Sequence, residues 1–224
     1  MMRSKLMLWG TAAALALGST AATASVVVVK STSKAYPAGK TLADSAKITL
    51  QGGDVVTLLG PGSAKTLRGP GSFEAKQVAM SSASSRRGRF GALRASEVAR
   101  NPSIWDIDVS QNGKMCVSSD NKVQLWRPMT DGAVTVNIRK PDGTTAPLTW
   151  AAGSALTDWP TGLAIKNGER YQVEWPASGD KSTLEFATVD APADMVGTAQ
   201  VLIANGCNNQ LDLLVASAGK GKGQ

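Results

Sequence analysis

The stretch LLGPGSAKT at residues 58–66 has residue types that can hold a phosphate group. In a phosphate-binding loop, GxxxxGK[ST], backbone N–H groups surround the phosphates and the lysine reaches them. That spacing needs two glycines where this chain has Leu59 and Ala64 ahead of Lys65. A helix must follow with its N-terminus at the phosphate, but Gly-Pro-Gly at 69–71 prevents one. We therefore predict a hairpin turn here and no nucleotide.

The chain contains no histidine, and this limits the chemistry that it can perform. Ser-His-Asp and Cys-His nucleophiles are excluded, and the commonest zinc ligand is missing. Carboxylate pairs can still transfer protons, as they do in glycosidases. Two close acidic pairs could face one way, Asp106 with Asp108 and Asp190 with Asp194. Neither lies in a recognisable motif, so we predict no catalytic residue and no cofactor, and keep a carboxylate-based carbohydrate-active enzyme as an alternative.

The segment DIDVSQNG at 106–113 also resembles a calcium-binding loop, with Asp106 and Asp108 as its first ligands. An EF-hand loop has glycine at its sixth position, where this chain has Gln111. Alternation explains the same pattern as the polar face of a strand over 104–110 that leads into a turn. We favour the strand, predict no metal site, and keep the two carboxylates as the weaker alternative.

Cys116 and Cys207 are the two cysteines of the chain. In an oxidising compartment, a pair of cysteines forms a disulfide by default, and no histidine is present to activate a cysteine nucleophile. Closing a loop of this length stabilises the fold by about 4–5 kcal/mol in the chain-entropy model. We predict a Cys116–Cys207 disulfide that clamps the C-terminal helices onto a β-sandwich.

Residues 1–24 have the pattern of a secretory signal peptide. Two basic residues precede an apolar run at 6–17, and Ala-Thr-Ala at 22–24 provides the small residues that signal peptidase requires. A membrane-spanning helix needs about 20 apolar residues, which is more than this run contains. We predict cleavage before Ser25, export to the periplasm or the exterior of a bacterium, and a mature protein that does not span the membrane.

Basic residues are concentrated at 78–101, where the apolar period disappears and Ser, Arg and Gly predominate. Such a composition is typical of a flexible linker. Its cations, among them Arg86, Arg87 and Arg89, could also contact anionic lipid or another polyanion of the envelope. A run of like charge is more often a solvated tether. We keep both interpretations and exclude nucleic acid because of the compartment.

Residues 25–77 read as a small β unit. Its short β-branched or alternating runs are separated by glycine-rich turns, which is the pattern of successive strands. The predicted strands cover 26–30, 47–50, 55–59, 64–68 and 72–76.

A rhythm of GDV at 53–55, LL at 58–59, Leu67 and GPG at 69–71 lies within this unit. It resembles the FecR-type periplasmic domain, in which such a rhythm recurs in small β units, and the resemblance covers residues 36–75. That family relays outer signals to a cytoplasmic sigma factor through a transmembrane helix. This chain has a cleavable leader in place of that helix, so the resemblance implies the β scaffold without the relay.

Residues 102–190 predict an antiparallel β-sandwich of immunoglobulin-like architecture. Apolar residues alternate along several short segments, and Asn-Gly, Asp-Gly and Gly-Asp dipeptides favour tight turns between them. Beyond them, apolar residues at helical spacing predict a helical pair at 191–218, with Asp190 as an N-cap and Gly206 as a C-cap. Residues 219–224 read as a flexible tail. The predicted fold class is therefore mainly β, with a small N-terminal β unit, a sandwich and a C-terminal helical pair.

All five tryptophans outside the leader lie beyond residue 102. Three of them share strand faces with aliphatic residues and are assigned to the core. Trp126 points away from Val123 and Leu125, and Trp159 lies in a loop. These two are the candidates for an exposed contact surface, including one that binds sugars.

These features predict a non-enzymatic exported envelope protein that acts as a binding or scaffolding module. Its expected partner is an envelope protein or a polyanionic or glycan surface. A sensor or accessory subunit that works through a membrane partner is the first alternative, and the carboxylate-based enzyme is the second.

Overall fold

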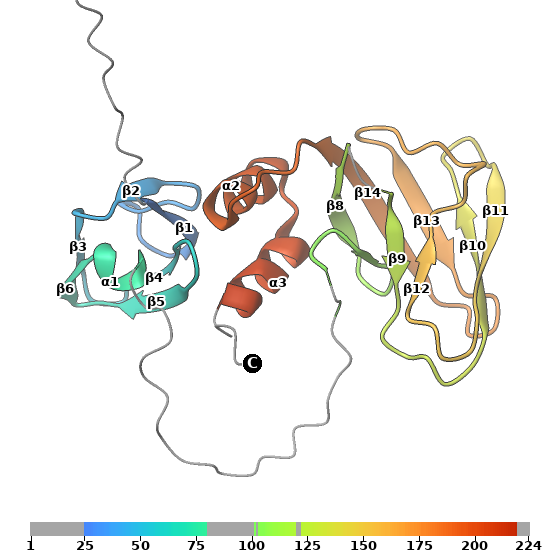
Figure 1. Cartoon of the computed structure of the whole chain (residues 1–224), viewed down its shortest axis with the longest axis horizontal. Coiled ribbons are helices and arrows are strands. Elements are labelled where there is room, and N and C mark those ends of the chain that lie inside the picture. Colours follow the sequence, from blue (N-terminus) through green and yellow to red (C-terminus); the bar gives the residue numbers. More distant parts are fainter. Residues whose placement is uncertain (1–24, 80–100, 102, 120–121, 219–224) are drawn as a thin grey trace, which may run out of the picture.

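The computed structural model describes residues 25–79, 101, 103–119 and 122–218. These residues form two β units with a pair of helices between them, so that the described part of the chain is elongated (Figure 1). Strands make up most of its regular structure. The predicted mainly β class with a C-terminal helical pair is confirmed.

The N-terminal β unit contains a four-stranded sheet and a two-stranded one. Its elements are β1 (Ser25–Ser31), β2 (Thr41–Ala43), β3 (Lys47–Leu50), β4 (Val55–Leu59), β5 (Ala64–Arg68), β6 (Gly71–Glu74) and the short helix α1 (Lys76–Ala79). The larger sheet has the order β2-β1-β4-β5, and β3 pairs with β6. All these pairings are antiparallel, and β3, β4 and β5 have the predicted bounds.

Strand β1 is buried on both faces, which explains its unbroken run of four valines. Val26 and Val28 belong to the core cluster of the N-terminal β unit. Val27 and Val29 belong to a second cluster that includes the C-terminal helices. A strand covered on both sides is apolar throughout rather than alternating. The four valines thus link the core of the N-terminal β unit to the helical pair.

The turn at 69–71 connects the two sheets of this unit. Gly69 donates its N–H to Asp54 O at 2.9 Å. A Cβ atom at this position would lie 2.0 Å from the carbonyl oxygen of Gln51. Only glycine permits such a close backbone approach.

The second β unit consists of two sheets. Its strands are β7 (Ile107–Asp108), β8 (Gly113–Ser118), β9 (Gln124–Trp126), β10 (Val134–Arg139), β11 (Thr145–Trp150), β12 (Leu156–Asp158), β13 (Arg170–Glu174) and β14 (Lys181–Val189). One sheet has the order β11-β10-β13-β14-β8 and the other β12-β9-β7. Leu125 of the smaller sheet shares one buried cluster with Ile138 and Val173 of the larger, so the core lies between the sheets.

Two strand pairings in this sandwich are parallel. β8 pairs with β14, and β7 with β9, in parallel registers. The sheets are therefore mixed, and the expectation of a wholly antiparallel sandwich is wrong. No hairpin connects β8 to β14, since five other strands lie between them in the chain, so nothing forces an antiparallel direction.

The strand predicted over 104–110 is reduced to Ile107 and Asp108. The chain turns before them, because Ser103 N–H donates to the Asp106 carboxylate at 3.1 Å and Asp106 N–H donates to Ser103 O at 3.3 Å. Asp106 is consequently only 9% exposed. The prediction that it lies on a polar strand face is wrong.

The helical pair is formed by α2 (Met195–Asn205) and α3 (Asn208–Ala218). The N-cap of α2 is Asp194, whose side chain accepts the Gly197 N–H at 2.8 Å. Asp190, the predicted cap, lies four residues too early and accepts a hydrogen bond from Ser119 Oγ instead. Gly206 ends α2 in the left-handed conformation, with φ of 73°, as predicted.

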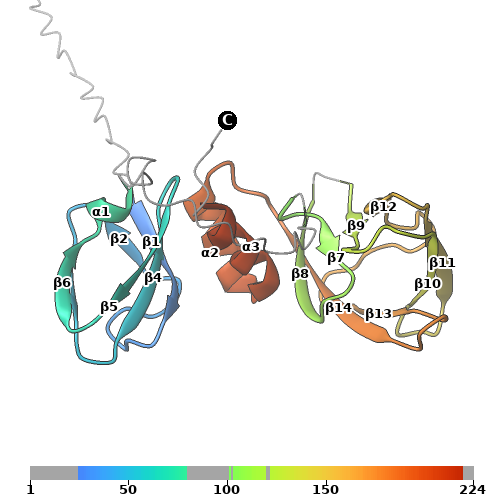
Figure 2. The same cartoon turned by 90° about the horizontal axis from the view of Figure 1, so that it is seen from below.

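The helices lie between the two β units (Figure 1, Figure 2). One apolar cluster contains Leu59 of β4, Val189 of β14 and Leu202 of α2. Lys30 Nζ of β1 lies 2.6 Å from Asp212 Oδ1 of α3. The helices therefore contact both β units. The sequence had suggested that they contact the sandwich alone.

The predicted signal peptide at 1–24 and tail at 219–224 lie outside the described residues. So does most of the predicted linker at 78–101. Its first two residues belong to α1, and the Val78 side chain is fully buried, so the folded unit extends past the predicted boundary. None of the helices in the described ranges is long and apolar enough to span a membrane.

Candidate contact surfaces

The stretch at 58–66 is a β-hairpin, as predicted. β4 and β5 pair antiparallel, and Gly60 N–H donates to Ser63 O at 2.8 Å to close the turn. Lys65 is exposed on β5 opposite Leu58. β6 follows where a phosphate site would need a helix N-terminus.

Cys116 and Cys207 form the predicted disulfide, and both are fully buried. Cys116 lies on β8, and Cys207 directly follows the C-cap Gly206. The bond therefore joins the larger sheet of the sandwich to the turn between α2 and α3. Their Cα atoms are 5.8 Å apart, which is usual for a disulfide.

Trp126 and Trp159 are buried, and the prediction that they form an exposed contact surface is wrong. They are 4% and 9% exposed. The indole of Trp159 packs edge-on against Tyr171 and Phe186, with ring centroids 5.2 and 5.1 Å apart, and its Nε1 donates to Leu163 O. Alternation along a strand shows which residues share a face, but it does not show whether another layer covers that face.

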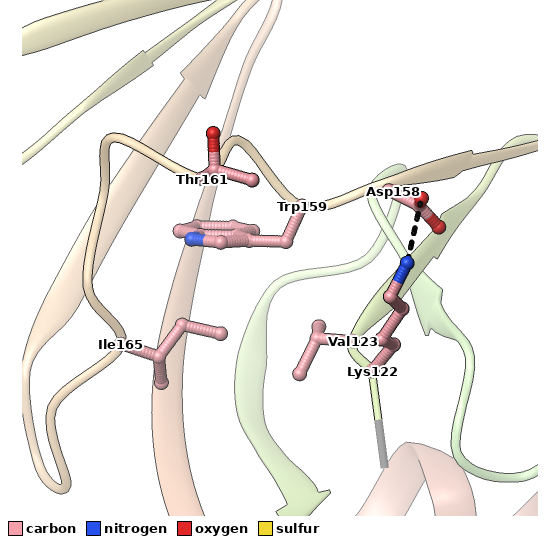
Figure 3. Close-up of a pocket in the computed structure, with 6 residues that line it drawn as sticks. All are labelled: Lys122, Val123, Asp158, Trp159, Thr161 and Ile165. Carbon is pink, nitrogen blue, oxygen red and sulfur yellow. Dashed lines mark ion pairs between the residues drawn. The ribbon is translucent and has the colours of Figure 1, made fainter.

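A shallow depression of about 250 Å³ lies beside Trp159 (Figure 3). Its lining residues are Lys122, Val123, Asp158, Trp159, Thr161 and Ile165. Lys122 Nζ and Asp158 Oδ2 are 3.8 Å apart at its side, and both side chains are largely exposed. The depression has room for a small apolar group. Its single carboxylate is already ion-paired, so its lining does not supply the two carboxylates of a glycosidase.

The two carboxylates of the calcium alternative point to different partners. Asp106 accepts from Ser103 N–H, whereas Asp108 Oδ1 accepts from the N–H and the Oγ of Ser110 at 2.9 and 2.6 Å. Burial raises the pKa of Asp106 above its ordinary value. In the described part of the chain, no group of three His, Cys, Asp or Glu side chains could hold a metal ion. Local turns account for both carboxylates.

The second acidic pair is also used by the fold. Asp194 caps α2, and Asp190 Oδ1 accepts from Ser119 Oγ at 3.1 Å. All four carboxylates of the two candidate pairs thus accept hydrogen bonds from turns, loops or a helix end.

Arg127 is a buried cation that the sequence analysis did not identify. It is 6% exposed, its Nε donates to Ser154 O at 2.9 Å, and its Nη2 donates to Gly132 O and Ala151 O at 2.8 and 2.9 Å. Its guanidinium carbon lies 5.9 Å from the centroid of the Trp150 ring. Arg127 therefore ties the loop after β9 to the loop after β11. A lone arginine next to a turn gives no sequence signal for this role, because most arginines are exposed.

The predicted basic contact residues Arg86, Arg87 and Arg89 lie outside the described residues. No family model, curated protein or solved structure matches this chain. The functional argument consequently depends on the residues and geometry described above.

Proposed function

We propose that this protein is an exported, non-enzymatic binding or scaffolding module of the bacterial envelope. The observation that carries the proposal is the apolar cluster in which the disulfide-linked helices join both β units. Val27 of β1, Cys116 of β8 and Leu211 of α3 all belong to it. A body held together in this way keeps surfaces at its two ends in a fixed relation, which is the property that a scaffold needs.

Two features support export. The leader pattern at 1–24 is one. The other is the Cys116–Cys207 disulfide, because such bonds persist mainly in oxidising compartments.

A non-enzymatic role is supported by the chemistry of the side chains. The chain has no histidine. The carboxylates of Asp106, Asp108, Asp190 and Asp194 each accept a structural hydrogen bond. Groups used in this way are poorly placed to exchange protons with a substrate.

We further propose that the sandwich is immunoglobulin-like. Its strands divide between a sheet of β8, β14, β13, β10 and β11 and a sheet of β7, β9 and β12, which resembles the division in that architecture. Tyr171 near the start of β13 places its hydroxyl 2.7 Å from Ala164 O, seven residues upstream. This arrangement resembles the tyrosine corner of immunoglobulin domains.

The N-terminal β unit is proposed as a FecR-like scaffold on the strength of residues 36–75 alone. Its Gly-Pro-Gly turn at 69–71 supports the proposal, because Gly69 is required there by the close approach of Gln51 O. The signal relay of that family is not part of the proposal.

A turnover assay tests the absence of catalysis. The secreted protein is incubated with cell-wall glycans, beside folded Asp106→Asn and Asp108→Asn variants and an Asp142→Asn control in the turn between β10 and β11. We expect no released sugar in any sample. Release that is lost in Asp106→Asn or Asp108→Asn but kept in Asp142→Asn would identify the carboxylate-based enzyme and overturn the proposal.

Cross-linking in an envelope extract tests the scaffold role. We expect the wild-type chain to capture a defined envelope component, and the Cys116→Ala/Cys207→Ala variant to capture less of it, because the two units are then held less firmly. A wild-type chain that captures nothing overturns the scaffold. Capture that is equal in both variants but requires residues 78–101 favours the sensor alternative.

A further inference from the structure

β5 is the outermost strand of the four-stranded sheet β2-β1-β4-β5. Along an antiparallel strand, residues whose N–H and C=O bind the neighbouring strand alternate with residues whose N–H and C=O point away from it. The bond from Gly60 N–H to Ser63 O closes the hairpin and fixes this alternation, so that Lys65 and Leu67 bind β4. The backbone groups that point outward belong to Ala64, Thr66 and Arg68.

The outward edge of β5 has no partner in the described part of the chain. No described residue donates to or accepts from the outward N–H and C=O groups of Ala64, Thr66 and Arg68. Thr66 and Arg68 are exposed, and β5 runs along the lower margin of the N-terminal β unit (Figure 1). An unpaired edge of this kind is a template for one more strand.

The other long edge strands are protected against such pairing. Among the described elements, β8 and β11 are the other edge strands of five or more residues. Gln210 of α3 binds the N–H and C=O of Cys116 on β8. Pro147 occupies an outward position of β11 and has no N–H to offer there. β5 has neither of these protections.

Two cations of β5 select the kind of strand that can pair with it. Lys65 and Arg68 are exposed and form no ion pair with a described residue. Because side chains alternate along a strand, Lys65 lies on the face of the buried Leu67, and Arg68 lies on the opposite face. Cations on an edge oppose pairing with an arbitrary strand. A strand that places an acid opposite each cation, one on each face, is attracted instead.

We propose that β5 binds an extended, acidic segment of a partner protein, which joins the sheet β2-β1-β4-β5 as a fifth strand. The outward backbone groups of β5 supply affinity, as in other complexes formed by strand addition, and Lys65 and Arg68 supply the preference for acids. A second copy of β5 fits less well, because it would bring two more cations to the same edge. The proposal rests on the scaffold role and names the chemistry of its partner.

Hydrogen exchange of the full secreted chain tests the proposal. The probe is the peptide TVETVETV, in which two acids lie three positions apart as the cations of β5 do, and TVKTVKTV is the control peptide. We expect the Thr66 and Arg68 N–H groups to exchange at least about fivefold more slowly when TVETVETV is added. The Lys65 and Leu67 N–H groups already bind β4 and should change by less than about twofold. TVKTVKTV should protect none of them.

A pair of proline variants tests the geometry. Thr66→Pro removes an outward N–H of β5, and Thr149→Pro removes an outward N–H of β11. The two threonines match, since each is exposed and shares a hydroxyl hydrogen bond of 2.9 Å with a threonine of the neighbouring strand, Thr57 or Thr135. Proline is tolerated at such edge positions because no bond to the neighbouring strand is lost. We expect Thr66→Pro to bind TVETVETV at least about tenfold more weakly and Thr149→Pro to bind it as the wild type does.

A pair of charge variants tests the preference for acids. Lys65→Gln/Arg68→Gln should weaken binding of TVETVETV by about threefold or more, because two cross-strand attractions are lost. Lys122→Gln/Lys140→Gln removes the same formal charge from the sandwich and should weaken binding by less than about twofold. Circular dichroism verifies that every variant is folded.

Four results overturn the proposal. They are slow exchange of the Thr66 N–H in the free protein, which means that the edge is already covered; no protection by TVETVETV; equal protection by TVKTVKTV; and equal losses within either pair of variants. These results concern β5 alone. If the envelope extract still yields a cross-linked component, the scaffold role stands and its partner binds elsewhere, whereas protection of β5 without any captured component contradicts the scaffold role only.

Discussion

The side-chain amide of Gln210 binds both backbone polar groups of Cys116. Cys116 N–H donates to Gln210 Oε1 at 2.6 Å, and Gln210 Nε2 donates to Cys116 O at 2.8 Å and to Ile104 O at 2.7 Å. β8 is the last strand of its sheet, so its outer edge would otherwise be unpaired. One glutamine of α3 thus takes the place of a neighbouring strand, beside the disulfide that fixes the same residue.

The Gln210→Ala variant should be about 2–4 kcal/mol less stable than the wild type. The substitution leaves the buried N–H and C=O of Cys116 and the partly buried C=O of Ile104 without this partner, and each such group is costly. Urea unfolding measures the change. The control is Gln200→Ala, since Gln200 is exposed and donates only to Thr41 Oγ1 at 2.7 Å, and it should change stability by less than about 0.5 kcal/mol. Equal effects of the two substitutions would contradict the assigned role.

Removal of the disulfide in the Cys116→Ala/Cys207→Ala variant should lower the free energy of unfolding by about 4–5 kcal/mol, because the bond closes a loop between residues 91 positions apart. The same unfolding experiment in a reducing agent checks the cause. The wild type should then approach the variant, and the variant should not change. A wild type that keeps its advantage after complete reduction would show that the loss comes from packing at the buried sulfur atoms.

Local signals in the sequence were sufficient for the N-terminal hairpins. β3, β4 and β5 have the predicted bounds because the glycine-rich turns that separate them act over a few residues. The disulfide could also be predicted, since Cys116 and Cys207 are the two cysteines of the chain. The class of the fold and the existence of the helical pair followed from periodicity alone.

Long-range packing could not be predicted from the sequence. Trp126 and Trp159 were expected to be exposed, but neither the alternation along a strand nor a position in a loop shows which other layer covers a side chain. Gln210 and its partner Cys116 are 94 residues apart. Arg127 carries no local motif for its contacts with three carbonyl groups. These residues acquire their roles only when distant segments meet.

The Arg127→Ala variant should loosen the loops after β9 and β11 and lower stability by about 2–4 kcal/mol, because three carbonyl groups lose a charged donor. Hydrogen exchange of the Gly153 N–H, which donates to Thr130 O across the two loops, measures the local effect and should accelerate. Arg127→Lys should not restore protection, since an ammonium cannot reproduce the planar guanidinium fork. Lys122→Ala serves as the control for loss of an exposed cation. Full protection in Arg127→Lys would contradict the geometric argument.

Alkaline pH should destabilise the protein through Tyr171. Burial of its hydroxyl and, to a smaller extent, the Glu169 carboxylate that accepts from it at 2.5 Å together raise its pKa to about 12. Because the folded pKa lies above the unfolded value of about 10, the stabilisation is fully present below pH 10 and is lost as the pH rises toward 12. Tyrosinate absorbance in a Tyr36→Phe background isolates the Tyr171 titration. Tyr171→Phe should cost about 1 kcal/mol at neutral pH, because it removes the single O–H donor that Ala164 O and the Glu169 carboxylate share, and its stability should fall less between pH 10 and 12. If Tyr171 in the folded protein titrates near 10, its hydroxyl is accessible to water and the tyrosine-corner arrangement is wrong.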